Sequence, residues 1–166
     1  MNYRKYLVLI ILLAVLLGIA GNVSSAKPEI PVATNLSELG KQAKRKNLPI
    51  LLMVSAHHCP YCELLKNEII NPMMVSGDYT DKVIMSELVL DWDSDIIGFD
   101  GAKKGPEDIA NDYYSVVTPT ILFLDHNGRE VQKRMIGVNT VEMYGFYLDE
   151  SIARALKKVR KKSRAK

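Results

Sequence analysis

The stretch "LPILLMVSAHHCPYCELLKNEII", residues 48–70, contains the signals that decide the fold. Its first part, residues 48–56, is a continuous apolar run, and such a run predicts a strand buried on both faces of a sheet. A helix is predicted directly after it, because Pro60 suits a first helical turn and the apolar residues that follow fall at helical spacing. Both cysteines of the chain, Cys59 and Cys62, lie at the start of that helix.

Strands and helices alternate along the rest of the chain. The expected elements are a helix at 35–47, a strand at 48–56, a helix at 59–74 bent at Asn71-Pro72, a strand at 82–91, a loop or small hairpin at 92–105, a helix at 106–116, a strand at 118–125, a tight turn at 126–128, a strand at 129–138 and a helix from about 140 to 161. This order predicts an α/β fold with a mixed four-stranded sheet and helices on both faces.

The N-terminus has the pattern of a targeting segment. A positive start, "MNYRKY", precedes an apolar run of 14 residues from Leu7 to Ala20, and Ser24 and Ala26 suit a signal-peptidase site before Lys27. As a helix this run would be about 21 Å long, shorter than the ~30 Å core of a bilayer. We therefore expect residues 1–26 to be a signal peptide cleaved after Ala26, with an uncleaved inner-membrane anchor as the alternative. Residues 27–166 would form the exported domain.

The charge is distributed unevenly along the chain. Of the 22 basic residues, two precede Lys27 and eight lie in the tail from Arg154 onward, which leaves 12 in the body against all 19 acidic residues. An acidic body argues against a nucleic-acid-binding surface, which would place basic residues on the folded face.

The order of elements, with "CPYC" opening a helix after a buried strand and "TPT" (118–120) opening the third strand, resembles the thioredoxin superfamily. The resemblance covers residues from about 36 to 160 and implies a thioredoxin-like fold and thiol–disulfide exchange. Cys59 would lie at the helix N-terminus, where N–H groups and the helix dipole stabilise a thiolate, so its pKa should lie below ~8.5. Cys59 is the expected nucleophile, and Cys62 the resolving thiol.

Two further motifs refine the resemblance. The Pro60-Tyr61 dipeptide resembles that of glutaredoxins and of the DsbG branch. Thr118-Pro119 resembles the cis-proline loop of the superfamily, which contacts the substrate chain, and its threonine resembles the DsbG branch. We therefore expect Pro60, Tyr61, Thr118 and Pro119 to bind substrate. The stretches "NPMMVSGDYTDKV" and "EMYGFYLDESI" resemble small exported bacterial thioredoxin-related proteins called SoxW-like.

The sequence departs from the family pattern at three places. Met53 stands where thioredoxins carry a buried acid, and Glu87 in the second strand is a candidate to lie beneath the motif and act instead. His58 replaces the tryptophan that precedes the motif; an imidazolium there would lower the Cys59 pKa further, or the side chain lies at the rim. The N-terminal dimerisation domain of Dsb isomerases has no room before the first helix, so we expect a monomer.

Two hypotheses from other classes remain open. A copper or zinc carrier would use Cys59, Cys62 and either His57 or His58, because two N and two S ligands suit these metals. Adjacent histidines point different ways, and His126 lies roughly 23 Å beyond Pro119 along an extended strand, so we expect no metal site. A binding module with a permanent structural disulfide is the other hypothesis.

The favoured function is an exported thiol–disulfide oxidoreductase that reduces protein disulfides or oxidised cysteines. Its partners would be protein thiol or disulfide substrates and an electron donor in the membrane, and we expect no nucleic-acid partner. The redox-active Cys59–Cys62 pair would need no cofactor.

Overall fold

The computed structural model describes Tyr3 and residues 28–164, so the predicted signal peptide lies, apart from Tyr3, outside the described residues. In that part of the chain no helix has both the length and the apolar character needed to cross a membrane. The elements are α2 (Leu36–Lys46), β1 (Ile50–Ser55), α3 (Pro60–Leu65), η1 (Lys66–Ile70), α4 (Asn71–Ser76), β2 (Ile84–Val89), β3 (Ile96–Ile97), β4 (Lys103–Lys104), α5 (Pro106–Asp112), β5 (Thr120–Leu124), β6 (Glu130–Ile136) and α6 (Val141–Arg164).

The four main strands form one mixed sheet in the order β2-β1-β5-β6. Strand β1 runs parallel to β2 and antiparallel to β5, and β6 pairs antiparallel with β5 at the edge. The predicted four-stranded mixed sheet is therefore confirmed. Strands β3 and β4 form the small hairpin that the segment 92–105 allowed.

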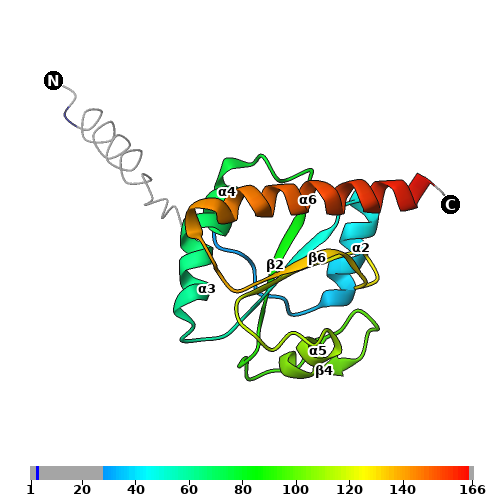
Figure 1. The fold of residues 1–166 in the computed structure, drawn as a ribbon. Coiled ribbons are helices and arrows are strands. Elements are labelled where there is room, and N and C mark those ends of the chain that lie inside the picture. The colour runs from blue at the N-terminus through cyan, green and yellow to red at the C-terminus, as the bar shows by residue number, and fades with distance from the viewer. Residues whose placement is uncertain (1–2, 4–27, 165–166) are drawn as a thin grey trace.

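Alternate residues of the central strands divide the core into two layers. Leu51 and Met53 of β1 pack with Cys62 of α3 and with buried residues of α6. Leu52 and Val54 face the other way and pack with buried residues of α2 and α5. Figure 1 shows this arrangement, with α6 above the sheet and α5 below it. The motif helix thus lies on the face that odd-numbered residues of β1 cover.

The motif helix continues past Pro72 with a change of helical pitch. Pro72 has no N–H to donate, and the residues before it form the π-helical turn η1, in which the N–H of Asn71 bonds to the carbonyl of Lys66. The helix then continues through Ser76 and ends at Gly77, which has a positive φ of 75°. The expected bend at Asn71-Pro72 is therefore a widened turn, which accommodates the proline without ending the helix.

Candidate active site

Cys59 and Cys62 form a disulfide at the point where β1 leads into α3. Cys59 is the N-cap residue of α3, and its sulfur accepts a hydrogen bond from the backbone N–H of Cys62 at 3.2 Å. Cys62 has no exposed surface, whereas Cys59 is half-buried. The first cysteine therefore offers the sulfur that a partner can reach, and the second is shielded from solvent.

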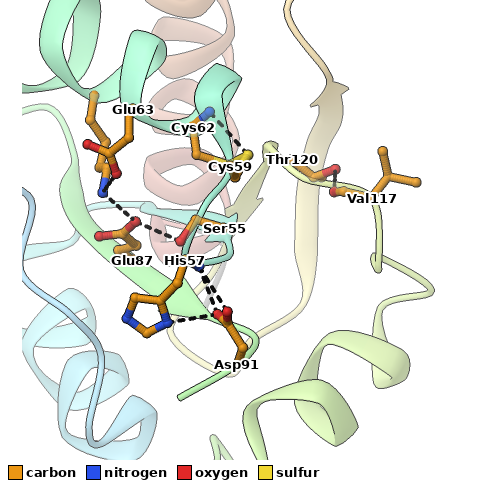
Figure 2. The surroundings of a disulfide bond; sticks show 10 residues. Ser55, His57, Cys59, Cys62, Glu63, Glu87, Asp91, Val117 and Thr120 are labelled. Atoms are coloured by element: carbon orange, nitrogen blue, oxygen red, sulfur yellow. Dashed lines mark hydrogen bonds and ion pairs between the residues drawn. A yellow bond between two sulfur atoms is a disulfide. The ribbon is translucent and has the colours of Figure 1, made fainter.

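A buried polar network lies on the same face of the sheet as Cys62. The Ser55 hydroxyl donates a 2.6 Å hydrogen bond to Oε1 of Glu87, which pairs with Nζ of Lys66 at 3.3 Å. Lys66 also pairs with Glu63 at 2.7 Å. Figure 2 shows Ser55 between the Glu87 carboxylate and the two cysteines. The register places Glu87 beside Met53, so a carboxylate from β2 lies next to the position where the sequence lacks one on β1.

The charges of this network reinforce each other. Partial burial lowers the pKa of Lys66, but hydrogen bonds and charges from Glu63 and Glu87 outweigh it, so the pKa of Lys66 lies above its ordinary value. Lys66 therefore stays charged and compensates the buried Glu87, which is 4% exposed. A cavity of about 50 Å³ adjoins the network; it is lined by Glu29, Ile30, Glu63, Lys66, Asn67, Asn71 and Glu87.

His57 and His58 form the turn that precedes Cys59, and they differ in their contacts. The imidazole Nδ1 of His57 lies 3.0 Å from Oδ1 of Asp91, and Figure 2 shows the ring beside Asp91 on the side away from the disulfide. His58 is exposed and has a positive φ of 55°. In residues 28–164 no group of three or more His, Cys, Asp or Glu side chains is arranged to hold a metal ion. The His57 imidazole therefore does not point toward the two cysteine sulfurs, as a copper or zinc carrier would require.

Thr118 and Pro119 lie beside the segment that enters the motif, and the peptide bond between them is cis. Val54 of β1 pairs with Thr120, so the two residues before Thr120 flank the end of β1. The Pro119 carbonyl accepts a 2.8 Å hydrogen bond from the N–H of Gly137. The pairing of β1 with β5 thus brings together two motifs that lie far apart in the sequence.

Several of the exposed side chains at this end of the molecule are apolar. Tyr61 at the start of α3 is 60% exposed, and Val116 and Val117 before the cis peptide are 59% and 56% exposed. Trp92 follows β2, and its ring lies nearly parallel to that of His57. A partner that reaches Cys59 would therefore meet exposed apolar side chains as well as the exposed polar residues His57, His58 and Asp91.

Sequence reasoning missed Ser55, Lys66 and Asp91 as members of the site. A signal for Lys66 was present, because Cys62 and Lys66 are four residues apart and so share one face of a helix. A signal for Asp91 was also present, because the carboxyl ends of parallel neighbouring strands meet at one edge of the sheet. Their partners across the chain became identifiable only with the strand register.

Comparison with known proteins agrees with this fold. A family model described as a thioredoxin-like domain matches residues 36–152. No curated protein sequence matches the chain. The structure is similar to oxidised mitochondrial thioredoxin 3 from Saccharomyces cerevisiae, with 19% identity over 75% of this chain and 93% of that chain and a TM-score of 0.51.

Two more solved structures give the same result. Oxidised thioredoxin O2 from Arabidopsis thaliana is 18% identical over 76% of this chain and 97% of that chain, with a TM-score of 0.51. A protein named DsbH oxidoreductase is 16% identical over 86% of this chain and 97% of that chain, with a TM-score of 0.57. At these identities the likeness shows the fold.

Proposed function

Since the chain belongs to the thioredoxin-like domain family and is a thiol–disulfide oxidoreductase, we propose that it is exported and that its Cys59–Cys62 dithiol reduces disulfides or oxidised cysteines of other proteins. The observation that carries the proposal is the unequal exposure of the two sulfurs: Cys59 is half-buried at a helix N-terminus and Cys62 is fully buried. Thiol–disulfide exchange needs an accessible attacking thiolate, and a shielded second thiol beside it can then resolve the mixed disulfide.

The reaction proceeds through two exchanges. The Cys59 thiolate attacks one sulfur of the substrate disulfide, that bond breaks, and the substrate's other sulfur leaves as a thiolate. Cys62 then loses its proton and attacks Cys59 in the mixed disulfide, which releases the second substrate thiolate and forms the Cys59–Cys62 disulfide. Two electrons pass from the protein to the substrate, and the disulfide pair itself carries them without a cofactor.

Glu87 is the group that we propose takes the Cys62 proton. It is buried, it lies on the same face of the sheet as Cys62, and its carboxylate holds the Ser55 hydroxyl that Figure 2 places toward the cysteines. A buried carboxylate within reach of a thiol, directly or through one hydroxyl or water, suits general-base catalysis. His58, adjacent to Cys59 and exposed, would favour the Cys59 thiolate when its imidazole is protonated.

The substrate chain would lie across Pro60, Tyr61, Thr118 and Pro119. Support comes from the exposure of Tyr61 and from the strand register that places Thr118 and Pro119 beside the motif. The apolar side chains on both sides of Cys59 favour a polypeptide segment over a small polar disulfide.

The direction of electron flow and the compartment belong to the proposal as well. Residues 1–26 have the pattern of a signal peptide, and disulfide chemistry suits an exported location. A reductase in an oxidising compartment needs an electron donor, which we propose lies in the membrane. Between β2 and β5 the chain forms only the β3–β4 hairpin and the short helix α5, in contrast to the large helical insertion of DsbA-type oxidases, and this favours reduction.

A trapping experiment tests the proposal. Reduced full-length protein is mixed with a disulfide-bonded model peptide, and the free peptide thiols are measured over time. The Cys62→Ser variant should accumulate a mixed disulfide through Cys59, and the Cys59→Ser variant should form none. Wild-type protein that reduces no peptide, or a Cys62→Ser variant that traps nothing, would contradict the proposed function.

A further inference from the structure

We propose that Asp91 is a positioning residue of this oxidoreductase: from the segment that follows the neighbouring strand β2, it holds the His57–His58 turn and thereby keeps the Cys59 sulfur at the N-terminus of α3. The inference rests on the proposed function in one respect, since it concerns the reactivity of Cys59. It assigns a role to a residue outside the motif, on the segment that follows β2.

The Asp91 carboxylate makes three contacts with His57. Its Oδ1 and Oδ2 accept the backbone N–H of His57 at 2.8 Å and 3.2 Å, and Oδ1 lies 3.0 Å from the imidazole Nδ1. Among residues 28–164, the only hydrogen bonds found for the His57–His58 turn are these contacts with Asp91. Asp91 thus supplies the hydrogen bonds found between this turn and the rest of the described chain, and Trp92 adds a ring contact.

The position of the turn determines the position of the nucleophile. Only residues 56–59 separate the last residue of β1 from Pro60, the first residue of α3. His58 adopts a left-handed conformation, φ 55°, and Cys59 immediately after it is extended, with φ −100° and ψ 97°. The Cys59 carbonyl accepts the N–H groups of Cys62 and Glu63 at 3.0 Å and 3.1 Å, so Cys59 is held by α3 on one side and by the turn on the other.

The Cys59 sulfur occupies a defined position at the N-terminus of α3. It accepts the Cys62 N–H at 3.2 Å at the positive end of the helix. Such an N–H and the helix dipole stabilise a thiolate only at close range, within the first turn. If the turn rotates, the sulfur leaves this N–H, and the thiolate becomes less stable.

Asp91 is well placed to hold the turn. Strand β2 is parallel to β1, and the N–H of Leu90 donates to the Ser55 carbonyl at 2.9 Å, so Asp91 arrives at the edge of the sheet where β1 ends. The backbone hydrogen bond from His57, together with the imidazole, holds the pKa of Asp91 below its ordinary value, so the carboxylate stays ionised. The Trp92 ring lies beside the imidazole, with the two ring centres 6.4 Å apart.

Two effects of Asp91 on Cys59 oppose each other and can be separated. The negative charge disfavours a nearby thiolate, whereas the hydrogen bonds hold the sulfur where the thiolate is stabilised. Asp91→Asn removes the charge and keeps an acceptor oxygen for the His57 N–H. Asp91→Ala removes both.

The test is a thiolate titration of the full-length reduced protein by ultraviolet absorbance, together with its rate of exchange with glutathione disulfide. We expect Asp91→Ala to raise the midpoint of the Cys59 titration by about one pH unit, so that about tenfold less thiolate is present at a pH well below both midpoints. Asp91→Asn should titrate at or below the wild-type midpoint. Asp93→Ala, an exposed neighbour on the same loop, is the matched control and should change nothing.

Each outcome decides the proposal. A wild-type midpoint in Asp91→Ala, an equal shift in Asp93→Ala, or an Asp91→Asn variant as impaired as Asp91→Ala would overturn it. If Asp91→Ala does not fold, His57→Ala replaces it; this variant keeps the backbone hydrogen bond, and a smaller rise of the midpoint is expected, while no rise would overturn the inference. Wild-type protein that does not exchange would contradict the proposed function, and the titration would still test Asp91.

Discussion

Cys59 and Cys62 differ most in their surroundings. Cys59 caps a helix and is half-buried, while Cys62 is completely buried beside a polar network of Ser55, Glu87 and Lys66. The sequence predicted the helix N-terminus at Cys59 and placed the candidate acid on Glu87. It could not place Lys66 or Ser55 in the network, because their contacts depend on how α3 packs on β1 and β2.

Glu87 gives a prediction for the second chemical step. A glutamine at this position cannot accept a proton, so Glu87→Gln should slow the resolution of the mixed disulfide by more than about tenfold. The first attack by Cys59 should keep its rate. Stopped-flow measurement of formation and decay of the mixed disulfide separates the two steps.

Glu29→Gln is the matched control for this prediction. Glu29 lines the same small cavity as Glu87 but is exposed. The Glu29→Gln variant should leave the rates of both exchange steps unchanged. A Glu87→Gln variant whose two steps slow equally, or not at all, would contradict the assigned role.

At the scale of elements, the turn between β5 and β6 shows which features a local sequence pattern can predict. The segment 126–128 predicts a tight turn, and the structure has one, closed by a 2.9 Å hydrogen bond from the N–H of Gly128 to the carbonyl of Asp125. The last helix, predicted from about 140 to 161, is also present, and α6 continues beyond that prediction to Arg164. The link between the two elements was beyond prediction: Lys162 donates to the buried Asp125 carboxylate at 2.8 Å across 37 residues.

This link predicts a pH-dependent contribution to stability. Burial raises the pKa of Asp125, but the hydrogen bond from Lys162 and the backbone N–H groups of Arg129 and Asn127 outweigh it, so the pKa lies below its ordinary value. A lowered pKa means that the stabilisation is present above the unfolded pKa of about 3.9 and is lost as the pH falls through the folded pKa.

Asp125→Asn should therefore lower the free energy of unfolding by about 1–2 kcal/mol near neutral pH, and the difference from wild type should shrink below about pH 4. Urea unfolding at several pH values measures both. Asp112→Asn is the control, because its ion pair with Lys104 is exposed to solvent and should leave the unfolding midpoint nearly unchanged. A difference for Asp125→Asn that stays constant into acid would contradict the account.

Gly128 gives a second prediction for the same turn. Its φ is +77°, and an added Cβ would lie 2.5 Å from the Phe99 ring and 2.8 Å from the Tyr113 hydroxyl. Gly128→Ala should lower the free energy of unfolding by about 2–4 kcal/mol, because the left-handed conformation and the overpacking both destabilise the fold. Gly77 has a similar φ of +75°, but an added Cβ would meet no atom within 4 Å. Gly77→Ala should therefore lower the free energy of unfolding by only about 1 kcal/mol. Equal losses in the two variants, measured by urea unfolding, would show that the clash is absent.

At the scale of the whole molecule, local patterns were sufficient for the fold class. The continuous apolar run at β1 predicted a buried central strand, and the segments at β2 and β5 were predicted as further strands; all three are fully or almost fully buried. Helical periodicity predicted α6, whose inner face packs on the sheet (Figure 1). The π turn η1 was not predicted, because proline in a helical pattern signals an interruption without specifying how the chain accommodates it.

The candidate active site was also predictable only where it depends on a local sequence pattern. Residues joined by the motif itself, Cys59 to Tyr61, follow from a contiguous stretch. Asp91 requires knowledge that β2 lies parallel beside β1, which alternation of elements suggests but does not specify residue by residue. The molecule therefore combines a motif that is local in sequence with supports that come from a neighbouring strand.

The reduction potential of the Cys59–Cys62 pair tests the central claim most directly. Full-length protein is equilibrated in glutathione buffers of defined poise, and the fraction of disulfide is measured. A value between about −120 and −270 mV, the span of exchanging protein disulfides, is the predicted result, with the lower part of that span expected for a reductase. A value below about −300 mV would identify a structural disulfide and contradict the account.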